Sequence, residues 1–275
     1  MPSIAPHPAA DLPDPAAPLL ELRQVRLRRG ATQVFDGLSL ALAEPRIGLI
    51  GHNGAGKTSL LRLLCALDVP ASGQVLSQGH NLHALPQGQL RALRVGMMFQ
   101  NPDDQIIFPT VQEELALGLQ PQGLPRRDAQ ARARDFLAGR GLAGWAERAV
   151  ATLSQGQRQQ VCWLALLLAG PRTLLLDEPY ASLDLPGQAR LADDIAACDR
   201  QVLVSTHVLD HVRGYPRVIW LHEGRVQADG PGREVCAAYE AAVARQVAQA
   251  RAGAAERNGG VGCEGCGQAD PGQAA

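Results

Sequence analysis

The sequence predicts an α/β protein in which a parallel sheet carries a phosphate-binding loop, with an antiparallel β subdomain and an inserted helical subdomain. Three observations predict this fold. The stretch Gly51-His52-Asn53-Gly54-Ala55-Gly56-Lys57-Thr58 matches G-x-x-x-x-G-K-[ST] between an apolar run and a helical pattern. Apolar runs alternate with helical patterns, which implies a parallel sheet. Between about residues 101 and 170 the apolar positions have helical spacing and include no buried strand.

The composition is that of a globular protein. The chain has 275 residues, 46% of them hydrophobic, and a formal net charge of -1. Because it has no global basic field, we expect no nucleic-acid partner. The longest apolar run, Val161 to Ala169, is far shorter than the roughly 20 residues that span a bilayer.

Both ends of the chain have biased composition. Residues 1–18 are rich in Pro and Ala and resemble neither a signal peptide nor an anchor, so we expect a disordered lead. Residues 251–275 are rich in Ala, Gly and Gln, and we expect a disordered tail. Cys263 and Cys266 form half of a zinc or redox motif without a second pair, and their role stays open.

The first elements are expected around the phosphate-binding loop. Leu19 to Leu27 and Val34 to Leu42 alternate loosely, which predicts a small antiparallel sheet with a turn at Asp36-Gly37. The run Ile47 to Ile50 predicts a buried strand that enters the loop, and Thr58 to Leu67 predict the helix that leaves it.

After this helix the chain returns to strands. Pro70 to Gly73 predict a turn, followed by a short strand over Gln74 to Ser77. Val95 to Phe99 predict a buried strand whose end carries Gln100. Ligands of open α/β sheets bind at the carboxyl ends of strands, so Gln100 is a candidate site residue.

The remaining elements follow from the same periodicities. Helices are expected at Val111–Leu119, Arg126–Ala138, from Leu153 through Ala169, at Gly187–Ala197 and at Pro231–Ala250; strands at Thr173–Asp177, Gln201–Ser205, Val218–Leu221 and Arg225–Ala228.

The phosphate-binding loop predicts a P-loop NTPase. Glycines let backbone N–H groups point at phosphate oxygens, and the helix N-terminus adds its positive dipole end. Lys57 is the only lysine of the chain, and a slim ammonium fits a tight loop where a planar guanidinium does not. We therefore expect residues 51–59, including Ser59, to bind ATP, with Lys57 at the β- and γ-phosphates and Thr58 on magnesium.

A pair of acidic residues later in the chain also supports ATP hydrolysis. Asp177 and Glu178 follow the strand-like run Thr173-Leu174-Leu175-Leu176. A buried strand would present Asp177 to the magnesium ion, while Glu178 would orient and polarise the attacking water.

Leu153-Ser154-Gln155-Gly156-Gln157, before Asp177, resembles the signature motif of ATP-binding-cassette (ABC) ATPases. The family's other motifs match in order: Gln100 as the Q-loop, Ser182-Leu183-Asp184 as the D-loop and His207 as the switch histidine. The resemblance covers about residues 19–230 as one ABC ATPase domain, and 231–250 follow as a C-terminal helix. It implies that Ser154, Gly156, Gln157 and Asp184 contact ATP held by a partner subunit, that Gln100 also ligates Mg²⁺, and that His207 faces the γ-phosphate.

Three segments indicate which group within the ABC family the chain resembles. Residues 100–111 (Q-N-P-D-D-Q-I-I-F-P-T-V) and 113–119 resemble ATPases of energy-coupling-factor (ECF) importers of vitamins and transition-metal ions. In those importers this surface receives helices of a transmembrane partner; the alternative for Ile106 to Phe108 is packing within the helical subdomain. Residues 178–186 look most like the ATPase of biotin importers, with a cobalt or nickel importer as the alternative.

The sequence also departs from the family. Arg28 or Arg29 stands where an adenine-stacking aromatic is usual, and a guanidinium plane can stack on adenine. Gln155 and Gln160 replace a usual glycine and arginine. The resemblance implies an ATPase with ATP and Mg²⁺, a second ATPase subunit in a homodimer, and a transmembrane coupling subunit with a substrate-binding membrane subunit at the cytoplasmic face. A soluble non-transport ABC protein is the less favoured reading.

Overall fold

The computed structural model describes residues 19–85, 92 and 94–259. A six-stranded sheet has the order β10-β9-β3-β8-β7-β6. Its strands are β3 (Arg46–Ile50), β6 (Val95–Met98), β7 (Thr173–Asp177), β8 (Gln201–Ser205), β9 (Arg217–His222) and β10 (Arg225–Gly230). All neighbours run parallel except β10, which pairs antiparallel with β9 at the edge. Every residue of β7 and β8 is buried, as expected for central strands of a sheet covered on both faces. The predicted parallel sheet is confirmed.

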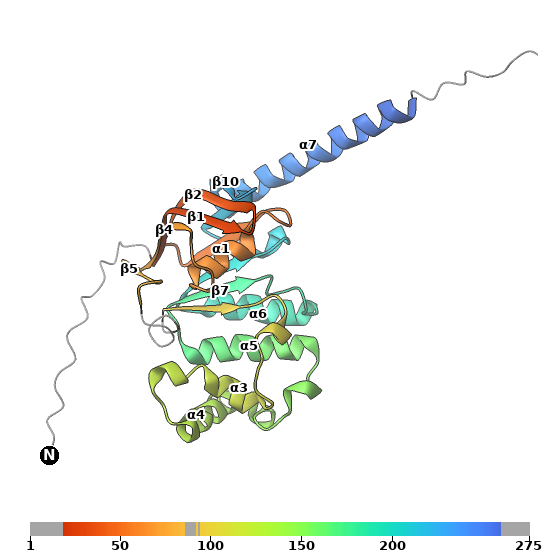
Figure 1. Ribbon diagram of the computed structural model, residues 1–275. Coiled ribbons are helices and arrows are strands. Elements are labelled where there is room, and N and C mark those ends of the chain that lie inside the picture. Colours follow the sequence, from red (N-terminus) through yellow and green to blue (C-terminus); the bar gives the residue numbers. More distant parts are fainter. Residues whose placement is uncertain (1–18, 86–91, 93, 260–275) are drawn as a thin grey trace, which may run out of the picture.

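The second sheet is antiparallel; in Figure 1 it lies at the top, where β2 is beside β10 of the large sheet. Its order is β2-β1-β4-β5, with β1 at Leu20–Arg29, β2 at Thr32–Leu42, β4 at Ser72–Ser77 and β5 at His80–Asn81. Leucines, Val25 and Phe35 of β1 and β2 point into one core with leucines of α1 (Lys57–Leu64). The predicted small sheet is therefore present beside the phosphate-binding loop.

The expected turn at Asp36-Gly37 was wrong. The hairpin instead turns between Arg29 and Thr32, and Asp36-Gly37 lie inside β2. The register shifts there from Val25 opposite Leu38 to Leu27 opposite Phe35, so β2 carries one extra residue. Gly37 has φ +74°, which fits a β-bulge. A glycine-containing pair that looks like a turn in sequence is thus a bulge within a long strand.

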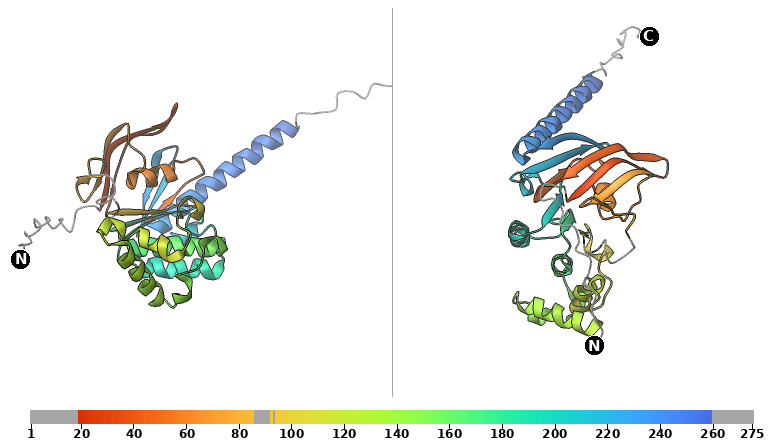
Figure 2. Two further views of the ribbon diagram at one scale, coloured as in Figure 1. Left: turned by 60° about the horizontal axis from the view of Figure 1, so that its bottom comes forward. Right: turned by 90° about the vertical axis from the view of Figure 1, so that its left-hand side faces the viewer.

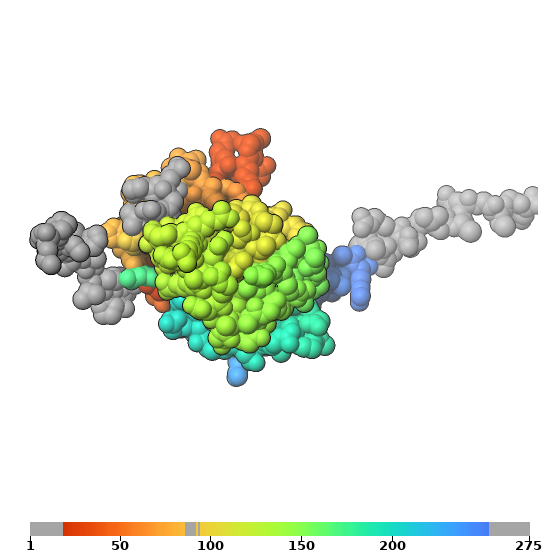
Figure 3. Space-filling view, turned by 90° about the horizontal axis from the view of Figure 1, so that it is seen from below, coloured from red at the N-terminus to blue at the C-terminus, as the bar shows by residue number. Residues whose placement is uncertain are grey.

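The helical region has a core of its own. It contains α3 (Val111–Leu117), α4 (Arg126–Ala138) and α5 (Gln155–Ala169). Val111 and Leu115 of α3 pack with Ala133 and Leu137 of α4 and with Val161 of α5. Figure 3 shows this region as one face of the molecule. Helix α6 (Leu185–Ala197) lies next to α5 in Figure 1 and packs Leu191 and Ile195 into the core under the large sheet.

Helix α7 (Gly232–Gly259) begins against the large sheet and then leaves it (Figures 1 and 2). Val235 and Cys236 in its first turns are buried, whereas Val247 is 44% exposed. The helix continues past the predicted end at Ala250. Residues 1–18 and the Cys263/Cys266 pair lie outside the described residues. In the described part of the chain, no helix is both long enough and apolar enough to span a membrane. The proposed division at residue 230 and the bounds of the helical subdomain stay predictions.

Candidate active site

The phosphate loop, Gly51 to Thr58, lies between the carboxyl end of β3 and α1. Gly51 has φ +147°, and a Cβ there would collide with the Leu221 carbonyl oxygen, so only glycine fits. Gly56 precedes α1 with φ +104°. Among the described residues no side chain caps α1 and no acidic residue occupies its first turn. The first N–H groups of α1 are therefore available to an anion.

Lys57 is folded back over the loop that carries it. Its Nζ donates to the carbonyl oxygens of Gly51 at 2.7 Å and His52 at 3.2 Å, and the residue is 8% exposed. Burial lowers the pKa of Lys57, while the charges of Glu178 and Asp177 act in the opposite direction. The ammonium therefore stands close to both acidic residues and at the centre of the loop.

Thr58 and Asp177 bring two hard oxygen donors together. Thr58 Oγ1 donates to Asp177 Oδ2 at 2.7 Å, and Asp177 is 3% exposed at the end of β7. Hydroxyl, carboxylate and amide oxygens suit Mg²⁺, which usually binds through one or two carboxylates plus substrate phosphates. The described residues contain no cluster of three or more His, Cys, Asp or Glu able to hold a metal alone. Thr58 and Asp177, with Gln100 on the wall of the same cavity, thus offer oxygen ligands that fit a magnesium ion arriving with a nucleotide.

Glu178 is held in a strained conformation next to His207. Its φ is +47°, and its N–H donates to the Ser205 carbonyl oxygen at 2.9 Å, so the chain turns sharply after β7. Glu178 Oε2 lies 2.8 Å from His207 Nδ1 and accepts from the His207 N–H at 3.3 Å. The Glu178 side chain is 11% exposed, whereas that of His207 is 65% exposed.

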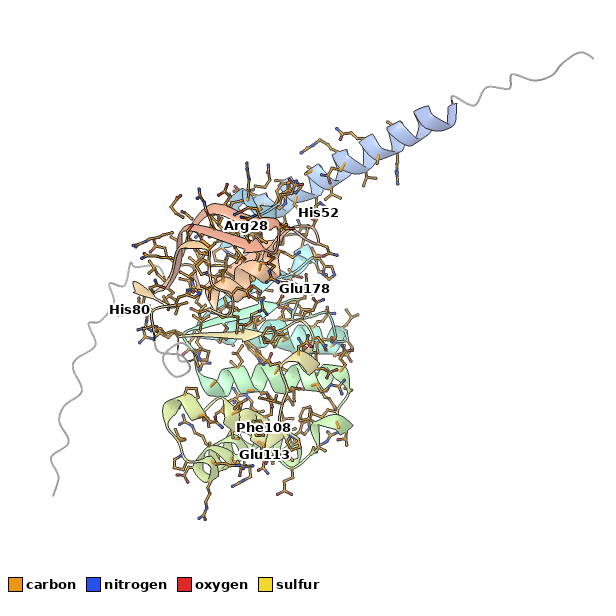
Figure 4. The ribbon with its side chains drawn as sticks, in the orientation of Figure 1. Arg28, His52, His80, Phe108, Glu113 and Glu178 are labelled. Atoms are coloured by element: carbon orange, nitrogen blue, oxygen red, sulfur yellow. The ribbon has the colours of Figure 1, made fainter. Side chains whose placement is uncertain are left out.

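The end of β8 is tied to the strand before the phosphate loop. The Thr206 N–H donates to the Leu49 carbonyl oxygen at 3.1 Å, and Thr206 Oγ1 accepts from the Val208 N–H at 3.1 Å. These bonds fix the position of His207 relative to β3. In Figure 4, His52 and Glu178 lie at the junction of the two sheets, far from Phe108 and Glu113 in the helical region.

One cavity of about 770 Å³ gathers most of the predicted site residues. Its walls include Arg29, Gly51–Gly54, Gly56–Ser59, Gln100, Asp177, Glu178 and His207. Ala55 is buried beneath the loop, where its carbonyl oxygen accepts from the Gly224 N–H at 3.1 Å. We call this space the nucleotide cavity.

Ser154, Gly156, Gln157 and Asp184 lie elsewhere. They line a second cavity of about 460 Å³ between α5 and α6, which we call the signature cavity. Ser154 Oγ accepts from the Gln157 N–H at 3.2 Å, and Gln157 Oε1 accepts from the Ser154 N–H at 3.1 Å, a reciprocal cap of α5. Asp184 caps α6 by accepting from the Gly187 N–H at 2.9 Å. One chain therefore carries the two sets of residues in separate places.

Arg29 is the arginine at the nucleotide cavity. Its Nη2 donates to Asp68 Oδ2 at 2.6 Å, and Asp68 is also bound by Arg62 from α1. Arg28, the preceding residue of β1 (Figure 4), does not line the cavity. Of the two arginines, Arg29 is thus the one positioned to meet a base.

Three cavity residues were missed from the sequence: Thr32, Val34 and Tyr239. Thr32 and Val34 begin β2, where a strand pattern does not say which residues face a ligand. Tyr239 lies in α7, far from the phosphate loop in sequence. Nothing in the local sequence around Tyr239 indicated that it lies at the nucleotide cavity.

The fold and this site define a phosphate-loop nucleotide hydrolase of the α/β class, and comparison with known proteins identifies its family. Residues 35–181 match the family described as ABC transporter. The chain is 45% identical over 235 residues to the biotin transport ATP-binding protein BioM of Rhodobacter capsulatus, covering 86% of this chain and 98% of that protein. It is 38% identical over 210 residues to the energy-coupling factor transporter ATP-binding protein EcfA1 of Symbiobacterium thermophilum, covering 74% and 72%. The chain belongs to the ABC transporter ATP-binding family and is an ATPase.

A solved structure agrees with the fold. The cbiO1 protein of Clostridium perfringens, described as part of the ABC transporter complex cbiONQ, superposes with a TM-score of 0.69 at 24% identity. The match covers 88% of this chain and 99% of that one. It confirms the predicted ABC ATPase architecture.

Proposed function

We propose that this chain is the ATP-hydrolysing subunit of an ECF-type importer, bound peripherally at the cytoplasmic face of the membrane, and that the cargo is biotin. The observation that carries the proposal is the segment after Gln100, which runs from the nucleotide cavity to a surface loop with an exposed isoleucine. Gln100 lines the cavity, and Ile107 is 72% exposed. A single short segment, which we call the docking segment, thus joins the site of hydrolysis to a surface that can bind a membrane partner.

The exposed loop is held rigid from beneath. The N–H groups of Ile107 and Phe108 donate to Glu114 Oε2 at 3.0 and 2.9 Å, and Glu114 is 4% exposed. Gln105 Oε1 accepts from the Phe99 N–H at 3.1 Å and ties the segment to the end of β6. A fixed backbone with an outward isoleucine favours docking over packing for Ile107, because packing would bury it.

A second contact runs from this segment to the signature residues. Arg158 Nε lies 3.0 Å from Asp103 Oδ1, and Arg158 Nη1 donates to the Leu153 carbonyl oxygen at 3.1 Å. Arg158 therefore joins the docking segment to the residue before Ser154. A push on the docking segment would move the N-terminus of α5 with it, which is the mechanical link a transporter needs.

Hydrolysis requires two copies of the chain. The separate nucleotide and signature cavities support a head-to-tail homodimer, in which Ser154 and Gly156 of one copy close over ATP on the phosphate loop of the other. The Ser154 hydroxyl and the N-terminus of α5 would meet the γ-phosphate. Asp184 and Gln157 lie beside them and would complete the closure.

Within the closed site each residue of this chain has a separate task. Lys57 and the loop N–H groups bind the β- and γ-phosphates. Magnesium, held by Thr58, Asp177 and Gln100, would neutralise phosphate charge. Glu178 accepts a proton from the attacking water, and His207 orients Glu178 while facing the γ-phosphate. Arg29 stacks on the base.

Biotin as cargo is supported by similarity to proteins with that name. Besides the protein of Rhodobacter capsulatus, a biotin transport ATP-binding protein of Rhizobium etli is 38% identical over 210 residues, covering 76% of this chain and 92% of that protein. The ATPase itself does not touch cargo, so an uptake measurement is needed.

Uptake of radiolabelled biotin should be measured in cells with and without this chain. We expect uptake to fall when the chain is absent and to return with the wild type but not with Glu178→Gln. Unchanged uptake in cells lacking the chain would reject biotin. Ile107→Asp should lose co-purification with a multi-helix membrane protein while its ATPase activity persists. Val247→Asp, at another exposed apolar position, on α7, is the control. Normal co-purification of Ile107→Asp would reject the docking surface.

A further inference from the structure

Tyr239 of α7 forms part of the nucleotide cavity. Its Oη lies 3.4 Å from His52 Nδ1, and the two rings are 5.4 Å apart between centroids, tilted by 43°. His52 directly follows Gly51 in the phosphate loop, and it is exposed. Tyr239 is therefore its aromatic neighbour from a distant part of the chain.

Trp220 supports Tyr239 from the sheet. The two rings meet edge to face at 87°, with centroids 5.2 Å apart, a favoured geometry for aromatic pairs. Trp220 stands opposite Ile50 in the β3–β9 register, and Ile50 directly precedes Gly51. The ring cluster thus spans from the strand that enters the phosphate loop to the first exposed residue of the loop.

The first half of α7 fixes where Tyr239 stands. Val235 and Cys236 of this helix are buried. Glu240, the next residue after Tyr239, is paired with Arg213 through two oxygens at 2.5 and 3.3 Å. Burial raises the pKa of Tyr239, so its hydroxyl stays protonated and can donate to His52 Nδ1. Tyr239 is anchored to the body of the protein on one side and to the phosphate loop on the other.

We propose that Tyr239 is a positioning residue for ATP: it holds His52, and through His52 the start of the phosphate loop, in the conformation that receives the nucleotide. The C-terminal helix thereby contributes to a site that the phosphate-loop motif alone does not complete. The proposal concerns ATP binding and hydrolysis, so it does not depend on the cargo or on the membrane partner.

The test compares steady-state ATP hydrolysis of the full chain with Tyr239→Ala, Tyr239→Leu and Tyr239→Phe. An aromatic contact of this kind corresponds to about a two- to tenfold effect. We expect KM for ATP to rise by about that factor in the Ala and Leu variants with kcat little changed, and Tyr239→Phe to restore most of the affinity. Val247→Ala, further along the exposed part of α7, is the matched control and should match the wild type. An unchanged KM in the Leu variant would overturn the proposal, and so would an equal rise in the Val247 control.

Two further measurements separate positioning from general stability. In a double-mutant cycle with His52→Ala, Tyr239→Leu should cause no additional rise in KM, because both changes remove the same contact. Additive effects would contradict action through His52. Trp220 reports the same contact by fluorescence when Trp145→Phe and Trp163→Phe leave it as the single tryptophan. In that background we expect ATP to change the Trp220 emission with tyrosine at position 239 and not with Tyr239→Leu. An identical response in the two proteins would also refute the proposal.

Discussion

Replacing Glu178 by glutamine removes one negative charge and one proton acceptor from the nucleotide cavity while keeping the shape of the side chain. The φ of +47° at Glu178 costs on the order of 1–3 kcal/mol, and glutamine pays the same cost, so backbone strain does not change. The contact with His207 is lost in part, but that side chain is 65% exposed, which limits its contribution to about 1 kcal/mol. For a protein of this size, about 1 kcal/mol corresponds to about 2–4 °C in melting temperature.

The effect on catalysis is expected to be far larger. A positioned general base contributes about 10²–10⁴-fold to a rate. At about 1.36 kcal/mol for each factor of ten, this corresponds to about 3–5 kcal/mol of transition-state stabilisation. Glu178→Gln should therefore lose at least about a hundredfold in kcat while remaining folded and able to bind ATP. Because the bound ATP is not consumed, the variant should also accumulate as a dimer.

Phosphate release under single-turnover conditions measures the chemical step, and size-exclusion chromatography with ATP measures the dimer. Glu223→Gln is a close control, because Glu223 is an exposed glutamate with the same φ of +47° and does not line the nucleotide cavity. We expect the control to hydrolyse ATP like the wild type. Near-normal turnover in Glu178→Gln would refute its role as the base, and a persistent monomer with ATP bound would refute the head-to-tail pair.

Three further changes test other parts of the site. Lys57→Ala removes the ammonium from the phosphate loop and should weaken ATP binding by at least about tenfold in titration calorimetry; affinity within about threefold of the wild type would contradict its assignment. Gly224→Ala places a Cβ against the Val34 carbonyl oxygen at a φ of +71°, so thermal unfolding should show a loss of more than about 1 kcal/mol, whereas Gly79→Ala, at φ +76° with open space around it, should lose less. Burial pushes the pKa of Asp68 up, but hydrogen bonds and charges from two arginines outweigh it and leave the pKa below its usual 3.8. Its contribution to stability is thus present above pH 3.8 and lost as the pH falls through the lowered value, and Asp68→Asn should flatten that part of the acid unfolding curve.

The sequence by itself determined the elements that contiguous residues encode. The phosphate loop, the strand that ends in Asp177 and the capped start of α5 each depend on neighbours within a few residues, because glycine conformations, strand burial and helix caps are local. The order of Gln100, Ser154 and His207 along the chain was also sufficient to indicate the family, which the comparisons confirm.

Only the tertiary structure decided which distant residues line the same cavity. The Asp36-Gly37 pair is a bulge because β1 and β2 pair over their full length. Arg29 rather than Arg28 lines the cavity because of the strand register and because its guanidinium is bound by Asp68. Tyr239 meets His52 only because α7 packs on β9, the neighbour of β3. Such contacts join residues up to 187 positions apart, and local patterning carries no information about them.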